Sequence, residues 1–155
     1  MVDKLTPERR SWNMSRIRGL NTKPERTLRS ALHRLGYRFR LHRGDLPGKP
    51  DIVLVRYRLA IFVHGCFWHR HGCSYTYTPK SRQEFWQRKF TGNSDRDRRN
   101  RQALKKLHWR VFVVWECEIK DKRNLAKKLE NIIKEARKIE LLHRKTKLKR
   151  EDVEL

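Results

Sequence analysis

The chain has few acidic residues, few cysteines and no long apolar segment, and each shortage excludes a class of protein. Its 155 residues include 17 Asp and Glu against 40 Lys and Arg, a formal net charge of +23. A chain with this imbalance repels itself unless a polyanion lies nearby. We expect a nucleic acid as the partner, because each phosphate contact releases counterions. Solvated surface charge and an anionic membrane are the alternatives.

The shortage of apolar runs argues against a membrane protein. The longest run, LAIFV at 59–63, is far too short to cross a bilayer, and residues 1–12 lack the apolar centre of a secretory signal. We expect a cytoplasmic, nucleoid-associated monomer. Three cysteines are an odd number, which argues against a disulfide framework. In a reducing compartment, a group of Cys and His residues more often binds a metal.

The order of helical and extended patterns predicts one α/β domain with a single central sheet. Thr22 and Glu25 form a capping-box pattern with Pro24 in the first turn, which is typical of a helix start. The expected elements are a polar arm or short helix over 7–18, a helix from 22 to 36, a loop over 43–50, a hairpin of strands 52–55 and 59–63, a short helix through 85–90 opened by a second capping box at 81–84, a helix over 95–107, a strand over 109–117 and a helix over 122–142.

These elements divide the chain into three parts. Residues 1–20 are expected to form an N-terminal arm that contacts the partner, and residues 21–142 the domain, with a metal-binding loop at 64–73. Residues 143–155 read as a charged C-terminal tail with frayed ends.

The stretch HGCFWHRHGC at 64–73 gathers the metal-binding residue types. Zinc prefers four Cys and His ligands in a tetrahedron. Cys66, His69, His71 and Cys73 are available here, and Cys117 follows a strand that can return its sulfur to them. We favour His71 over His69, because it stands in a glycine-bearing turn between the two cysteines. The alternative is three idle thiols beside unrelated histidines.

A carboxylate stands at the start of the expected hairpin. Asp51 precedes the first strand, and the second strand ends at Val63 and His64. Metal-dependent nucleases often hold a divalent ion with a carboxylate on one strand and polar groups on its neighbour. Mg²⁺ keeps several waters, so one or two protein oxygens suffice. A Pro-Asp pair alone is more often a turn; the high positive charge favours a nuclease.

At these positions the chain resembles the very short patch repair endonuclease family, relatives of the PD-(D/E)xK nucleases. The resemblance implies a restriction-endonuclease-like fold, with a central mixed β-sheet flanked by helices and a structural zinc site. It also implies an enzyme that nicks one strand of double-stranded DNA 5′ to the T of a T:G mismatch left by deamination of 5-methylcytosine. The matching stretches are WNMSRIR (12–18), LPGKPDIVL (46–54), FVHGCFWHRHGC (62–73), EFWQRKFTGNSDRDRR (84–99) and WRVFVVWEC (109–117).

The resemblance assigns roles to individual residues. Asp51 would hold a catalytic Mg²⁺, with the backbone carbonyl of Val63 sharing it. His69 would be the general base, a role that suits an imidazole near neutral pH, with His64 close to the phosphate and Asp97 orienting an imidazole.

Further positions match the family as well. Glu25 would lie near the site, although the capping box alone also explains it. The zinc ligands would be Cys66, His71, Cys73 and Cys117, in agreement with the choice made above.

Three aromatic residues match the family's wedges, which enter the DNA beside the mismatch. Phe67 and Trp68 lie in a loop between the metal-binding residues, where a large ring has little core to reach, and Trp86 matches the third. Opening a mismatched step costs less than opening a paired one, and stacking recovers part of the cost. The rings could instead cover the zinc. Positions that match groove contacts at the mismatch are Met14, Lys89 and Asn93.

One position departs from the family, which has Thr where this chain has Val63. A carbonyl ligand tolerates the change, whereas a hydroxyl ligand would be lost. Two other functions fit the same residues: a restriction-type or structure-specific endonuclease, and a zinc-stabilised DNA-binding module without catalysis. The downstream repair partners and the preferred flanking sequence are not encoded in any recognisable pattern.

Overall fold

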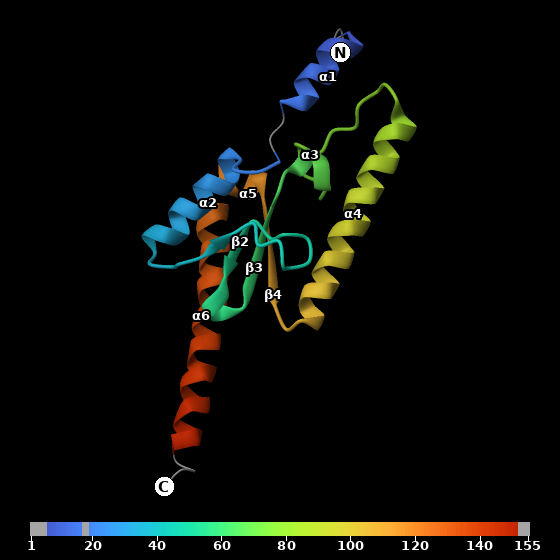
Figure 1. The fold of residues 1–155 in the computed structure, drawn as a ribbon. Coiled ribbons are helices and arrows are strands. Elements are labelled where there is room, and N and C mark those ends of the chain that lie inside the picture. Colours follow the sequence, from blue (N-terminus) through green and yellow to red (C-terminus); the bar gives the residue numbers. More distant parts are fainter. Residues whose placement is uncertain (1–5, 17–18, 152–155) are drawn as a thin grey trace.

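The structure, a computed structural model, describes residues 6–16 and 19–151, with side chains up to Lys145 except those of Pro7, Arg10 and Met14 (Figure 1). It is an α/β domain with one mixed sheet flanked by helices, as the sequence predicts. The helices are α1 (Pro7–Ser15), α2 (Lys23–Arg34), α3 (Cys66–His69), α4 (Gln83–Lys106), α5 (Glu116–Lys120) and α6 (Lys122–Glu151), and the strands are β1 (Arg40–Leu41), β2 (Ile52–Leu54), β3 (Leu59–His64) and β4 (Arg110–Trp115).

The sheet has the order β1-β2-β3-β4. β1 and β2 pair antiparallel, as do β2 and β3, and a 3₁₀ turn over Val55–Tyr57 closes the predicted hairpin. β3 and β4 run parallel, with His64 opposite Trp115 at their carboxyl ends. A parallel pair needs a long crossover, which α3 and α4 supply.

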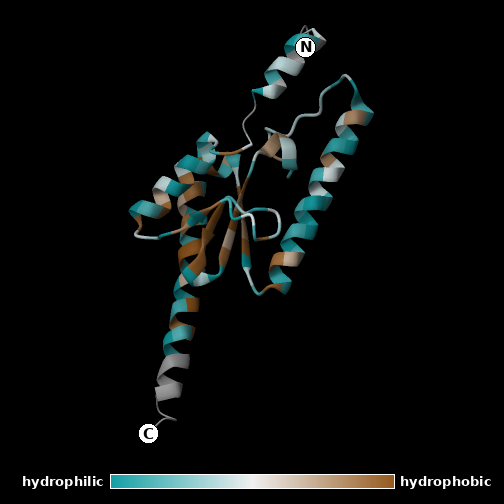
Figure 2. Ribbon diagram, viewed as in Figure 1, coloured by the Kyte–Doolittle hydropathy of each residue, from teal (hydrophilic) through white to brown (hydrophobic). Residues whose placement is uncertain are grey.

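Alternate strand residues point to opposite faces of the sheet, so each face has its own core. α2, α5 and α6 cover one face, and α4 with the loop before β2 covers the other (Figure 1). The first core contains Leu28, Leu32, Ile52, Leu54, Leu59, Ile61, Val114, Ile119, Ile132, Ala136 and Ile139, and the second Leu46, Val53, Ala60, Phe62, Leu104 and Trp109. Figure 2 shows the hydrophobic colour concentrated on the strands of the sheet.

The predicted capping box at the start of α2 is confirmed. The Thr22 hydroxyl accepts a hydrogen bond from the Glu25 N–H at 3.4 Å, and the Glu25 carboxylate accepts from the Thr22 N–H at 3.3 Å. Gly36, with φ +85°, follows the helix in the left-handed conformation that suits glycine at this place. These caps fix where α2 begins, and therefore where Glu25 lies.

The two helices predicted over 85–107 are one continuous helix, α4, and the separate short helix was wrong. Ser81 is not its cap: Arg82 occupies that place with φ +54° and makes no side-chain cap. Gly92 lies inside α4, since a single glycine costs a helix only about 1 kcal/mol. Tertiary contacts on both sides of Gly92 outweigh that cost, because Phe90 and Asn93 are both buried.

The last helix is longer than predicted. α6 begins at Lys122 as expected and continues to Glu151, through much of the segment read as a tail. Its apolar stripe ends at Ile139, so the last part extends past the sheet (Figure 1). Among the residues described, none of the helices combines the length and apolarity that crossing a membrane requires.

Ile132 tests the packing of α6, because its side chain is fully buried against the sheet. We expect Ile132→Ala to lower the free energy of unfolding by about 2–5 kcal/mol, the cost of an unfilled cavity. Urea unfolding followed by circular dichroism measures it. Leu141→Ala, at an exposed position of the same helix, should change it by less than about 0.5 kcal/mol. Equal losses in both variants would contradict this packing.

Candidate functional site

A cleft of about 830 Å³ opens beside the carboxyl end of β3. The start of α2, the loop before β2 and one face of α4 form its walls. Among its lining residues are Glu25, Asp51, Val63, His64, His69, Lys89, Asn93 and Asp97. The structure therefore brings together, in one cavity, the six residues predicted for chemistry and three of those predicted for DNA contacts, Trp68, Lys89 and Asn93.

Asp51 lies just before β2, opposite the end of β3. Its Oδ2 accepts a hydrogen bond from the Val63 N–H at 2.7 Å, which holds the carboxylate across the hairpin. Burial, helped by the negative charge of Glu25, raises the pKa of Asp51 to about 6 despite that hydrogen bond. A buried carboxylate of this kind favours a cation beside it, and its oxygens are the ligands that Mg²⁺ prefers. With the Val63 carbonyl nearby, the residues present fit such an ion.

A second group joins two histidines and an aspartate. Nδ1 of His69 lies 2.5 Å from Oδ2 of Asp97, and the ring of His64 stacks on that of His69 with centroids 3.9 Å apart. Burial alone would raise the pKa of Asp97, but the hydrogen bond from His69 and the nearby imidazoles outweigh it and lower the pKa. Asp97 is therefore ionised, and its carboxylate lies within hydrogen-bond distance of the His69 ring.

His64 is uncharged, unlike a cationic side chain that would pair with a phosphate. Burial, with the neighbouring His69, lowers its pKa to about 3. Its ring also meets that of Trp115 edge-on, with centroids 5.2 Å apart. His64 is therefore neutral at physiological pH, and it supports the face of His69 without adding charge.

Glu25 lies deep in the wall of the cleft and is nearly fully buried. Its carboxylate accepts hydrogen bonds from the Asn21 and Thr22 N–H groups, the Thr22 hydroxyl and Arg29. His42 stands next to it, with Nε2 3.5 Å from Glu25. Glu25 thus combines the capping role with a place beside Asp51, and both interpretations of this residue apply.

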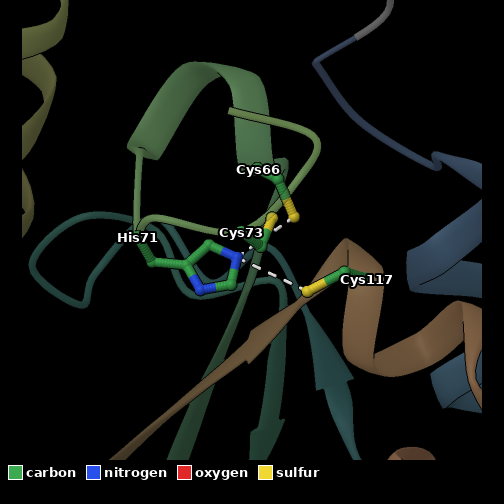
Figure 3. A group of neighbouring side chains, drawn as sticks. All are labelled: Cys66, His71, Cys73 and Cys117. Atoms are coloured by element: carbon green, nitrogen blue, oxygen red, sulfur yellow. Dashed lines mark hydrogen bonds between the residues drawn. The ribbon is translucent and has the colours of Figure 1, made fainter. Parts of the chain in front are cut away.

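Three thiols and one imidazole converge beside the cleft (Figure 3). Nε2 of His71 lies 3.3 Å from Sγ of Cys66 and 3.4 Å from Sγ of Cys117, and Cys73 completes the group. Zn–S bonds of about 2.3 Å and a Zn–N bond of about 2.0 Å in a tetrahedron would place S and N roughly 3.5 Å apart. The cluster thus has the donor set and spacing of a closed zinc site.

The chemistry of the cluster also suits zinc. Burial raises the pKa of the Cys66 thiol to about 12, so a dication is needed to keep that sulfur as a thiolate ligand. The ring of Trp115 stacks on that of His71 with centroids 4.0 Å apart. Since Trp115 covers the ligand imidazole, the predicted wedge rings are not needed for that purpose.

Phe67 lies at the centre of an aromatic cluster on the other side of the loop. Its ring centroid is 4.9 Å from those of Trp68 and Tyr77, and 5.4 Å from those of Trp86 and Phe90. The three predicted wedge residues therefore lie together, Phe67 and Trp68 on α3 and Trp86 on α4.

The remaining predicted DNA contacts differ in their surroundings. Lys89 is exposed at the cleft, whereas Asn93 is buried and donates to the Trp68 carbonyl at 2.9 Å. The Asn93 side chain thus joins α3, which carries Phe67 and Trp68, to α4. The side chain of Met14 lies outside those described. Two residues before it, Trp12 is exposed in α1 between the guanidinium groups of Arg9 and Arg16.

Sequence reasoning missed three residues of the site. His42 and Arg29 complete the polar network around Glu25, and Trp115 covers His71. The signal for His42 was present in YRFRL at 37–41, where apolar and basic residues alternate as in a strand. Reading that strand as a partner of the hairpin would have placed His42 opposite Asp51.

Comparison with known proteins gives a consistent result. The family model described as DNA mismatch endonuclease Vsr matches residues 2–75. The chain is 53% identical over 133 residues to the Type II nicking enzyme V.XorIIP of Xanthomonas oryzae pv. oryzae, covering 86% of this chain and 98% of that protein. It is 42% identical to the Type II nicking enzyme V.NmeAIP of Neisseria meningitidis (87% and 96%) and 43% identical to the DNA mismatch endonuclease Vsr of Escherichia coli K12 (81% and 80%).

Metal analysis distinguishes the two candidate histidines. We expect the purified protein to carry one zinc ion, His71→Ala to lose it and His69→Ala to keep it, because only His71 contacts the thiols. Mass spectrometry of the metal content measures this. The melting temperature of His71→Ala should fall by about 10 °C or more, since each kcal/mol corresponds to about 2–4 °C at this size. Zinc loss in His69→Ala alone would reverse the assignment.

Proposed function

Because the chain belongs to the Vsr family of DNA mismatch endonucleases, we propose that it nicks one strand of duplex DNA 5′ to the T of a T:G mismatch. The observation that carries this proposal is the meeting of Asp51 with the His69–Asp97 pair in one cleft, beside an aromatic cluster. The net charge of +23 supports DNA as the substrate. The reaction is hydrolysis of a phosphodiester bond.

Asp51 and the carbonyl of Val63 would hold Mg²⁺ at the cleft. The ion supplies stabilisation of charge on the phosphate and lowers the pKa of the attacking water. A carbonyl ligand explains how valine can stand at a position where the family has threonine. The hydrogen bond from the Val63 N–H to Asp51 fixes the distance between the two ligands.

His69 would take the proton of the attacking water. Its Nδ1–H donates to the ionised Asp97, which leaves the lone pair on Nε2 as the acceptor of the ring. As the water oxygen bonds to phosphorus, its proton passes to Nε2, and the bond to the leaving oxygen breaks. Asp97 then stabilises the imidazolium, in the way a carboxylate supports a histidine base in other hydrolases.

The neutral state of His64 helps this step. Its ring lies flat against His69, so a charge on His64 would oppose the gain of a proton by His69. The low pKa of His64 avoids that repulsion. His64 is therefore proposed to support the base and to approach the phosphate as a neutral hydrogen-bonding group.

The aromatic cluster is proposed to select the mismatch. Phe67, Trp68 and Trp86 would enter the base stack, where a T:G pair is easier to open than a matched one. The proposed zinc site holds Cys66 and Cys73 at either end of this loop, and Asn93 holds the carbonyl of Trp68. Both restraints reduce the entropy that the rings would lose on insertion.

A second candidate is an endonuclease that nicks a matched duplex at a defined sequence. The name "Type II nicking enzyme" given to two of the relatives favours it. The catalytic groups would be the same, and only the source of specificity would differ. Substrates with and without a mismatch separate the two.

A nicking assay with Mg²⁺ tests reaction and specificity together. We expect T:G duplexes to be nicked at least about 100-fold faster than T:A duplexes in some flanking context, with U:G in between or similar. Asp51→Asn should lower the rate by at least about 100-fold, because it removes the negative ligand. Asp45→Asn, at an exposed loop aspartate, is the matched control and should leave it unchanged. Equal nicking of T:A would favour the second candidate.

The pKa of Asp51 predicts how metal binding depends on pH. Since burial raises it from 3.8 to about 6, protons compete with the cation until near neutrality. We expect Mn²⁺ affinity, measured by electron paramagnetic resonance, to fall about tenfold per unit below about pH 6 and to level off above about pH 7.

Two further measurements check the direction of the pKa shift and its assignment to Asp51. The metal-free protein should lose stability as pH rises from about 4 through 6, because the folded state holds the Asp51 proton more tightly than the unfolded state. The pH dependence of Mn²⁺ affinity should persist in Asp45→Asn. The carboxylate that this variant removes has a lowered pKa in the wild type, because Arg43 donates a hydrogen bond to it. A flat Mn²⁺ affinity down to pH 5 would contradict Asp51 as the ligand.

A further inference from the structure

His42 is a half-buried histidine beside Glu25 and Asp51 that the proposed reaction does not use. It follows β1 directly, and its N–H lies 3.5 Å from the carbonyl oxygen of Asp51, which continues the β1–β2 ladder. Its φ is +46°, in the left-handed region that costs most residues free energy. The backbone therefore holds this imidazole beside Asp51 in a conformation that needs a compensating contact.

The neighbours of the ring determine which nitrogen carries the proton. Nη2 of Arg29 lies 2.6 Å from Glu25 and 2.8 Å from Nε2 of His42. A guanidinium group only donates hydrogen bonds, and the two hydrogens of Nη2 serve these two acceptors. Nε2 of His42 must then be the acceptor, so the proton of the neutral ring is on Nδ1.

Nδ1 of His42 is buried and has no hydrogen-bond partner within the described part of the chain. Oδ1 of Asp51 lies 3.7 Å from this nitrogen. An N–H to carboxylate bond is normally about 2.7–2.9 Å long, so a shift of about 1 Å would form it. Oδ2 of Asp51 is already held by the Val63 N–H, which leaves Oδ1 as the oxygen without a backbone restraint.

We propose that His42 is a positioning residue for the metal-binding carboxylate: it donates its Nδ1–H to Oδ1 of Asp51 when the cation binds. Arg29 fixes the tautomer that makes this possible, and Glu25 fixes Arg29. The capping box of α2 thereby reaches the metal ligand through three hydrogen bonds, Glu25 to Arg29, Arg29 to His42 and His42 to Asp51. This inference rests on the proposed role of Asp51 as the Mg²⁺ ligand.

The proposal explains why Glu25 lies at the cleft without contacting Asp51 by a hydrogen bond of its own. A third carboxylate oxygen near the ion would add charge, but Glu25 is neutralised by Arg29 and acts through His42. Partners that orient a ligating carboxylate typically change metal affinity by about 10–100-fold when removed.

Divalent-cation binding to three variants tests the donor. Mn²⁺ affinity is measured by electron paramagnetic resonance on the zinc-loaded protein at pH 7.5. We expect His42→Leu to weaken it about 10-fold or more. His42→Asn should stay within about threefold of the wild type, because its amide N–H₂ occupies the place of Nδ1–H and asparagine tolerates a left-handed φ. His108→Leu is the matched control, since His108 is exposed and has φ +58°.

Two outcomes of this measurement would overturn the proposal. If His42→Leu binds Mn²⁺ like the wild type, Asp51 needs no support from His42. If His42→Asn binds Mn²⁺ as weakly as His42→Leu, the shape of the imidazole ring matters and not its N–H donor. Circular dichroism confirms that each variant is folded.

The tautomer is tested on the wild-type protein, without any substitution that could unfold it. Long-range ¹H–¹⁵N nuclear magnetic resonance of the histidine rings should show His42 protonated on Nδ1 alone at pH 7.5. Arg29→Leu should move part of the population to the Nε2–H form. A wild-type ring protonated on Nε2 would overturn the inference. This result is independent of nicking: a protein with the expected tautomer and Mn²⁺ affinities but no T:G cleavage would fail the proposed function alone.

Discussion

In the parallel pair at the centre of the sheet, β3 and β4 end together, and the residues that follow both strands meet. His64 lies opposite Trp115, so Cys66 and Cys117 each come two positions after a paired residue. α3 and α5 start at this point and turn the two sulfurs toward His71. Without this register the three thiols would lie apart. The segment 66–73, whose helix α3 carries Phe67 and Trp68, would then not be joined to the end of β4 through Cys117.

Two different proposed metal sites lie at this end of the sheet. The sulfur-rich cluster follows the end of β3, and Asp51, the proposed Mg²⁺ ligand, lies across the hairpin. Soft thiolates favour zinc, whereas a carboxylate and a carbonyl favour magnesium, so ligand type alone keeps the two sites distinct. His64 and His69 are proposed as ligands of neither metal, and their stacked rings are supported by Asp97 from α4.

The sequence allowed most of the sheet and the four-residue sulfur cluster to be predicted, because strong local patterns marked them. The hairpin had two apolar runs around a short turn, and all three cysteines had one plausible meeting place. The continuity of α4 was missed, since Gly92 and Ser94 resemble a break when the contacts of Phe90 and Asn93 are unknown. β1 was missed although YRFRL at 37–41 alternates apolar and basic residues, because only Arg40 and Leu41 pair with β2. The proposed role of His42 depends on Arg29, a partner from another element.

α4 carries one functional stripe. Trp86, Phe90, Asn93, Asp97, Asn100 and Leu104 recur at intervals of four and three, so they lie along one side of the helix. Trp86 and Asp97 are eleven residues apart, which is about three turns and roughly 16 Å along the axis. The helix therefore sets the distance between Trp86 of the proposed wedge and Asp97, the hydrogen-bond partner of the proposed base His69. Inserting or deleting one residue between them would rotate one end by about 100°, so this segment can change its composition across evolution but not its length.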